Sequence, residues 1–145
     1  MVHEIDEEIF IEAVPAKIFA AWTEAPHVLA WWGDVNEFRT IAFESDLRVG
    51  GRWRAQFEAV TDKSLSSLAG EYRRVERPHF LSFTFEASWD PGSVTLVDLE
   101  FRASGTGTLV KLRHSGFGDG ETAAGSKEVW NATLDWLRCY LTKKN

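Results

Sequence analysis

The chain has 145 residues, of which 44% are hydrophobic, 13% aromatic and 26% charged. This composition is typical of a globular protein, so we expect a single domain over residues 1–145 and not a disordered chain. The formal net charge of −6 argues against a nucleic-acid binder, because phosphate backbones are bound by clustered Lys and Arg side chains.

The sequence predicts a cytoplasmic protein with no membrane span. Residues 1–12 are rich in acidic side chains and lack the basic start and apolar run of a signal peptide. No apolar run reaches the roughly 18 residues that a membrane helix needs. The one cysteine, Cys139, cannot form a disulfide within the chain, which agrees with a reducing compartment.

The first third of the chain predicts one strand and two short helices. Apolar and acidic residues alternate over residues 5–13, as in a half-buried strand. Pro15 suits a first helical turn, and apolar residues follow it at helical spacing until a second proline breaks the pattern. A second short helix is predicted over residues 26–32, where Gly33 ends it.

The middle of the chain has a period of two residues, which predicts consecutive antiparallel hairpins. Turn residues, mostly Gly, Pro, Asp and Ser, separate the alternating segments. The predicted strands cover residues 52–59, 68–76, 80–86, 97–101 and 108–114. We expect a curved antiparallel sheet of about seven strands.

The last part of the chain predicts one long amphipathic helix. Apolar residues recur at steps of three and four between residues 126 and 141, after the glycine-rich segment 116–120. The apolar face of the sheet is the surface large enough to cover this helix. The predicted architecture is therefore α+β, with the carboxy-terminal helix lying across the sheet.

Seven short motifs in this order resemble the family named after the activator of heat-shock protein 90 ATPase. The resemblance spans nearly the whole chain and implies the helix-grip fold of the START-like, birch-pollen-allergen-like superfamily. One departure is Val129-Trp130, where the family often has Gly-Trp, and the branched side chain is expected to narrow the space under the helix. The matching motifs are Val14 to Trp22, Trp31-Trp32-Gly33, Gly50-Gly51-Arg52-Trp53, Gly70-Glu71-Tyr72, Pro78 to Phe85, Gly107 to Phe117, and Trp130.

Strand parity and the resemblance both place large apolar side chains between the sheet and the long helix. Such side chains either interlock as a solid core or line a cavity, and the sequence leaves both interpretations open. Trp22 and Trp31 are expected to anchor the short helices, and Trp32 to lie at a pocket mouth. The candidate ligand-binding residues are Trp32, Trp53, Phe57, Tyr72, Phe83, Phe85, Leu99, Phe101, His114, Trp130, Leu134 and Leu137.

His114 and Tyr72 are the candidate catalytic residues. The alternation of side chains along the strand 108–114 places His114 on the concave face of the sheet. A titratable ring there, near Tyr72, would orient a ligand carbonyl or move a proton. The alternative is a hydrogen-bonded interior histidine. The four histidines lack metal-ligand spacing, and the glycine-rich segment 116–120 lacks a phosphate-loop ending, so neither a metal nor another cofactor is predicted.

The sequence favours a binding protein for a lipophilic or aromatic small molecule over an enzyme. Two alternatives stay open: a chaperone-associated or stress-response interaction protein, and a cyclase- or aromatase-type enzyme that uses His114 and Tyr72. A homodimer through an exposed sheet edge or through the tryptophan-rich end is a further open alternative.

Overall fold

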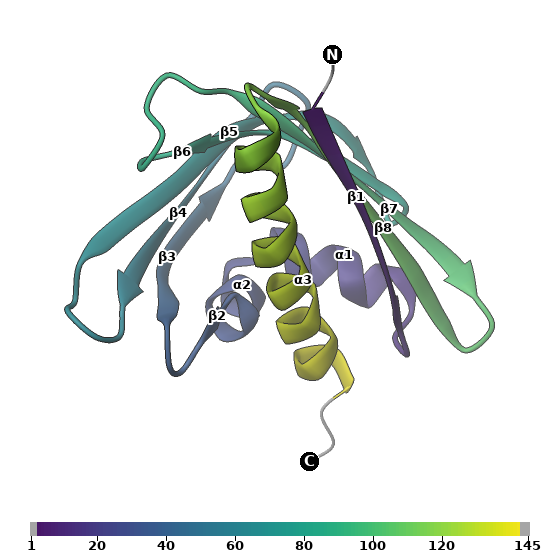
Figure 1. The fold of residues 1–145 in the computed structure, drawn as a ribbon. Coiled ribbons are helices and arrows are strands. Elements are labelled where there is room, and N and C mark those ends of the chain that lie inside the picture. Colours follow the sequence, from purple (N-terminus) through teal and green to yellow (C-terminus); the bar gives the residue numbers. More distant parts are fainter. Residues whose placement is uncertain (1–2, 143–145) are drawn as a thin grey trace.

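One long helix lies in the hollow of a curved antiparallel sheet (Figure 1). The structure is a computed structural model, and it describes residues 3–142. The predicted α+β architecture and helix-grip arrangement are confirmed. No helix in the described range is long and apolar enough to cross a membrane.

The sheet contains eight strands instead of the expected seven or so. Its order is β1-β8-β7-β6-β5-β4-β3-β2, and every neighbouring pair is antiparallel. The first strand therefore pairs with the last. The strands are β1 (His3–Ile11), β2 (Gly33–Asp34), β3 (Phe38–Ser45), β4 (Arg52–Ala59), β5 (Leu65–Glu76), β6 (Phe80–Ala87), β7 (Thr95–Ser104) and β8 (Gly107–Phe117).

Strands β2 and β3 are the ones that the sequence pattern missed. The register of β3 against β4 shifts between Thr40 and Ala42. This bulge changes which residues face inward, because side chains alternate strictly only along an unbroken strand. Thr40 and Phe43 are consequently both buried although their numbers differ in parity.

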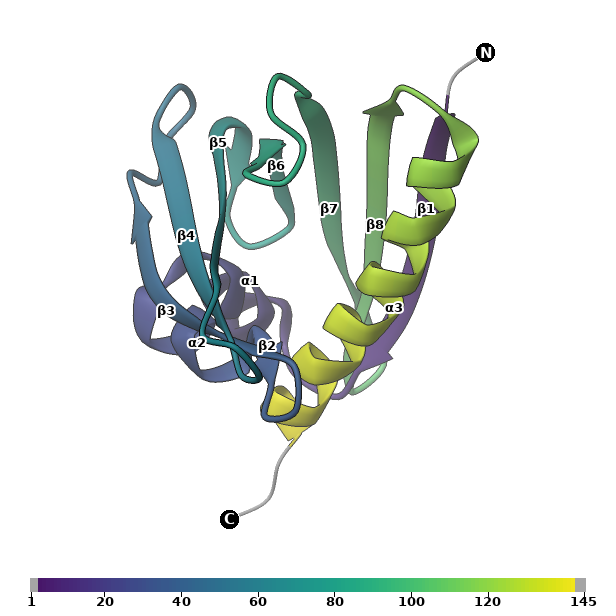
Figure 2. The ribbon, with the colours of Figure 1, turned by 60° about the vertical axis from the view of Figure 1, so that its left-hand side comes forward.

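The two predicted short helices are α1 (Pro15–Thr23) and α2 (Ala25–Trp31). They close one end of the hollow that the sheet forms (Figure 2). The ring N–H of Trp31 donates to the carbonyl of Ala21 at 2.7 Å and ties the two helices together.

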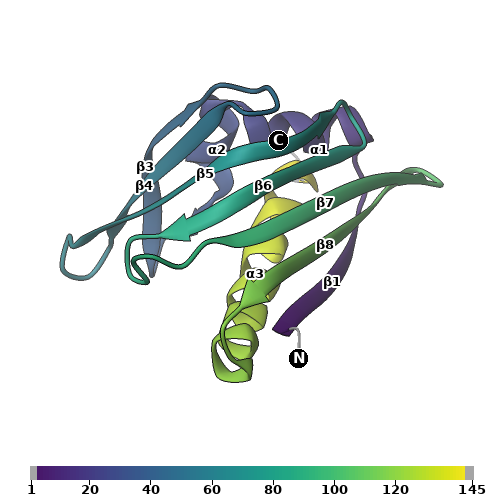
Figure 3. The same cartoon turned by 90° about the horizontal axis from the view of Figure 1, so that it is seen from above.

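The long helix is α3 (Gly120–Thr142), and it begins at Gly120, earlier than the predicted residue 126. Asp119 caps it, because its carboxylate accepts the backbone N–H of Thr122 at 2.7 Å. The first turns carry small and polar residues, so they show no apolar repeat. The sheet arches over α3 (Figure 3), and the apolar ridge of the helix is buried against it: Trp130, Thr133, Leu134 and Leu137.

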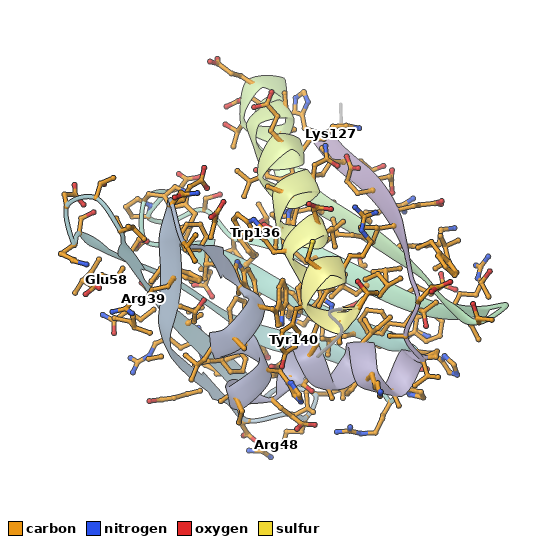
Figure 4. All side chains as sticks on the ribbon, turned by 90° about the horizontal axis from the view of Figure 1, so that it is seen from below. Arg39, Arg48, Glu58, Lys127, Trp136 and Tyr140 are labelled. Carbon is orange, nitrogen blue, oxygen red and sulfur yellow. The ribbon has the colours of Figure 1, made fainter. Side chains whose placement is uncertain are left out.

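The carboxy-terminal half of α3 is fixed to α2 and β3. His27 of α2 shares a hydrogen bond with the hydroxyl of Tyr140 at 2.7 Å. Trp136 meets Phe38 of β3 edge-on, with 5.6 Å between ring centroids. Trp136 and Tyr140 lie on the flank of α3 that faces these elements (Figure 4). The closed end of the hollow is thus filled by side chains.

Candidate ligand cavity

A cavity of about 610 Å³ is bounded by the amino-terminal half of α3. The helices α1 and α2 lie at the opposite end of the hollow (Figure 2). The cavity walls come from the ends of β6, β7 and β8, from the β6–β7 loop and from α3. The lining residues are Phe85, Ala87, Trp89, Asp90, Ser93, Thr95, His114, Phe117, Gly118, Asp119, Thr122, Gly125, Ser126, Val129, Trp130 and Thr133.

The cavity exists because α3 changes character along its length. Before Trp130 its lining residues are Thr122, Gly125, Ser126 and Val129, of which the first three are small or polar and Val129 is mostly exposed. From Trp130 onward the inward residues include two fully packed leucines. Small side chains leave open the space that large ones fill, so the same helix bounds a cavity at one end and a solid core at the other.

His114 lies at the floor of the cavity in a directed chain of hydrogen bonds. The ring N–H of Trp130 donates to His114 Nδ1 at 2.9 Å. Since Nδ1 accepts, the proton of the neutral ring is on Nε2, which lies 2.7 Å from Thr95 Oγ1 and donates to it. The Thr95 hydroxyl then donates to the carbonyl of Phe85 at 3.2 Å. Both ring nitrogens are therefore engaged.

Burial keeps His114 neutral. The residue is only 1% exposed, and desolvation lowers the pKa of His114 from 6.5 to about 4. Phe85 and Phe117 pack against the ring, with centroids at 4.8 and 4.4 Å. At neutral pH the ring is an uncharged member of an aromatic wall.

The mouth of the cavity carries residues that the sequence analysis did not select. Trp89 lies in the β6–β7 loop and is 63% exposed, and Val129 of α3 is 60% exposed. Asp90 and Asp119 line the same region. In the sequence Trp89 directly precedes Asp90-Pro91-Gly92, a segment typical of a turn, and this position is the signal that could have identified it as a loop aromatic.

Three of the predicted ligand-binding residues line this cavity: Phe85, His114 and Trp130. Four others line a second space of only about 10 Å³: Trp32, Trp53, Tyr72 and Phe83. The remaining five are buried and line neither space: Phe57, Leu99, Phe101, Leu134 and Leu137. Three of the predicted residues thus border the larger space, and the other nine are packed in the core or border a space too small for a ligand.

Tyr72 and His114 do not meet in one site. The hydroxyl of Tyr72 is 2.7 Å from Ser45 Oγ, and burial raises the pKa of Tyr72. His114 bonds instead to Thr95 and Trp130 and faces the larger cavity. The expectation that the two side chains would converge on one ligand is not met.

The tryptophans of the short helices form a packed cluster. The ring of Trp22 lies 5.1 Å from Trp31, 5.7 Å from Trp32 and 6.1 Å from Trp130. Trp32 is 8% exposed and stacks on Trp31, so it lies inside the core and away from the mouth of the large cavity. Trp130 contacts this cluster and also lines the cavity, and it separates the two.

The described residues 3–142 contain no group of three or more His, Cys, Asp and Glu side chains arranged to hold a metal ion.

Residues 12–142 match the family described as Activator of Hsp90 ATPase homolog 1-like protein. The chain belongs to this family. A search of the curated proteins found no match.

Solved structures of similar proteins share the fold of this Activator of Hsp90 ATPase homolog 1-like chain. Protein CV1439 from Chromobacterium violaceum has a TM-score of 0.87 at 17% identity, covering 98% of this chain and 99% of that one. The AHSA1-like protein from Aeromonas hydrophila has a TM-score of 0.82 at 24% identity, covering 98% and 97%. CalU16 from Micromonospora echinospora has a TM-score of 0.70 at 20% identity, covering 98% and 78%.

Val129 and Trp130, where the sequence departs from the usual Gly-Trp of the family, both border the cavity. Trp130 lies in the middle of α3 and not near its start, and Val129 lies at the rim of the cavity with most of its side chain exposed. The branched side chain of Val129 thus borders the opening, whereas Trp130 forms the inner wall.

Proposed function

We propose that the protein is a cytoplasmic binding protein for a lipophilic or aromatic small molecule, which it holds in the cavity under the amino-terminal half of α3. The supporting observation is the cavity itself. Its volume of about 610 Å³ falls within the roughly 300–1,000 Å³ of ligand pockets. Its aromatic walls with a few hydroxyl groups are also typical of such pockets, and the family's START-like fold agrees with a ligand-binding domain.

We propose binding and not catalysis because of how His114 is held. Its Nδ1 lone pair accepts from Trp130, so it is not free to accept a substrate proton. Tyr72, the other candidate, lines a different space. In the proposed function, His114 fixes the orientation of Trp130 and thereby shapes the inner wall of the cavity.

A substitution that fills the cavity tests this function. Ser126 lies on α3, is half-buried and lines the cavity. We expect Ser126→Phe to block the binding of N-phenylnaphthylamine, a neutral fluorophore whose emission rises in apolar surroundings. Titration of the probe should give a saturable signal in the wild type and a loss of affinity of about tenfold or more in this variant, since the new ring occupies the ligand volume.

Ser126→Ala is the matched control, because it alters the same position without filling space, and its affinity should equal that of the wild type. A thermal unfolding curve for each variant confirms that it is folded. A wild-type protein that gives no saturable signal, or a Ser126→Phe variant that binds as the wild type does, contradicts the proposal.

A further inference from the structure

The lining of the large cavity contains acidic side chains and no Lys or Arg. Asp90 and Asp119 are its carboxylates, both at the mouth, and His114 is neutral at the floor. The opening is therefore negatively charged around an apolar interior. A ligand with an anionic head would meet like charges there.

Asp119 keeps its negative charge. The hydrogen bond that its carboxylate accepts from the backbone N–H of Thr122 is the main cause of the lowered pKa of Asp119. The amino terminus of α3 contributes a partial charge of about +0.5, which one full carboxylate more than offsets. The helix start alone would attract an anion, but with Asp119 as its cap the net charge there is negative.

Two bases among the described residues 3–142 lie near this region, but neither belongs to the cavity lining. Lys127 of α3 is paired with Glu7 of β1 at 3.2 Å, on the side of the helix away from the cavity lining. His3 contributes a minor attraction to Asp119 and lies outside the lining. The two carboxylates therefore dominate the charge that an entering ligand meets.

Aromatic rings line the same space. Trp89 lies at the mouth, and Phe85, Phe117 and Trp130 form the inner walls. The electron-rich faces of aromatic rings attract ammonium groups, and tryptophan attracts them most strongly. Carboxylates beside aromatic rings are a combination that recognises organic cations.

We propose that the ligand of this cavity is a hydrophobic organic cation, an amine or quaternary ammonium ion with an apolar tail. Its head lies at the mouth among Trp89, Asp90 and Asp119, and its tail extends inward against Phe85 and Trp130. This inference rests on the proposed binding function and adds the chemical class of the ligand.

Three competitors with the same alkyl chain test the charge preference. Octyltrimethylammonium, octanol and octanoate are each used to displace bound N-phenylnaphthylamine from the full-length protein, below the micelle-forming concentrations of the two ions and the solubility limit of octanol. We expect octyltrimethylammonium to compete about tenfold better than octanol, and octanoate to compete worse than octanol. The preference should shrink as salt is added, since the acidic residues lie at the solvent-exposed mouth.

The double variant Asp90→Asn, Asp119→Asn removes both charges and keeps the helix cap, because Asn caps as well as Asp does. Its preference for the ammonium over octanol should fall to about twofold. Asp62→Asn is the matched control: Asp62 also accepts a nearby backbone N–H, from Ser64 at 2.9 Å, but lies outside the lining. This control should retain the wild-type preference.

The outcomes separate this inference from the proposed function. If the fluorophore does not bind, the proposed function fails and the inference with it. If the fluorophore binds but octanoate competes as well as octyltrimethylammonium, the function stands and the cation inference is overturned. A preference that persists in the double variant also overturns it, because the carboxylates would then not be its cause.

Discussion

His114 shows how a single residue is assigned its role by its neighbours. An isolated histidine titrates near neutral pH and serves in proton transfer. Here Trp130 donates to one ring nitrogen, Thr95 accepts from the other, and aromatic rings exclude water. The sequence left two roles open for His114, catalysis and a hydrogen-bonded interior ring, and these contacts support the second.

The first residue-scale prediction concerns the pH dependence of stability. The folded protein has a pKa for His114 of about 4, whereas an unfolded chain has about 6.5. Between these values the unfolded state binds a proton that the folded state does not. The free energy of unfolding should therefore fall as the pH is lowered through this window, by about 3 kcal/mol from this group in total.

Urea unfolding measured from about pH 7 down to about pH 4 checks this effect. His114→Gln removes the titrating ring, so this variant should start from a lower stability and lose less of it over the same range. Equal losses in the variant and the wild type would show that His114 does not cause the acid sensitivity.

At the scale of elements, two glycines differ in the space around them, one in a strand and one in the long helix. Gly70 of β5 lies opposite Trp53 of β4, and an added Cβ would lie 1.8 Å from the carbonyl of Thr84 and 2.5 Å from Trp53 Nε1. No side chain fits there, and the glycine allows the indole to lie across its neighbouring strand. Gly125 of α3 differs, since an added Cβ would meet nothing within 4 Å.

The two glycines therefore give opposite predictions. Gly70→Ala should lower the free energy of unfolding by about 2 kcal/mol or more, because strand backbone must move to relieve the overlap. Gly125→Ala should raise it by about 0.5–1 kcal/mol, because alanine favours the helix and encounters no obstacle. Denaturant unfolding of the two variants measures both changes, and a stable Gly70→Ala protein would contradict the close packing of β4 on β5.

At the scale of the whole molecule, α3 spans a filled end and an open end. Leu137 lies in the filled end and is 0% exposed, whereas Val129 borders the cavity. The filled end supplies the buried apolar area, and the open end borders the cavity. Packing stability and the proposed binding function thus belong to different ends of one helix.

This division predicts unequal effects of shortening apolar side chains along α3. Leu137→Ala should cost about 2–5 kcal/mol, because it leaves a void in packed surroundings. Val129→Ala should change the free energy of unfolding by less than about 0.5 kcal/mol, because its side chain is mostly in solvent. Chemical denaturation compares them, and equal losses would show that the amino-terminal half of α3 is packed as tightly as the rest.

Much of the fold was predictable because its signals are local. Alternation identified strands β4 to β8, and spacing identified the inward ridge of α3, including Trp130 and Leu137. The prediction failed where one local rule was interrupted. The bulge after Thr40 hid β3, and the small residues before Ser126 hid the first turns of α3.

The candidate site was predictable only in part. Parity placed Phe85, His114 and Trp130 on the inner face, and all three line the cavity. Parity cannot tell which inward side chains interlock, so Phe101 and Leu137 were grouped with them although both are packed. Trp89 was missed because it reaches the site from a loop, which has no period.

The sequence by itself determined most of the elements, their order and the inward faces, since these follow from residue spacing along the chain, and its short motifs carried the family resemblance. Only the tertiary structure decided where the interior is empty, that Tyr72 and His114 lie apart, and that Asp90 and Asp119 share one opening. The physical reason is that the empty volume inside the protein and the charge at the cavity mouth depend on side chains from segments far apart in the sequence. Only the packing of the folded chain brings those side chains together.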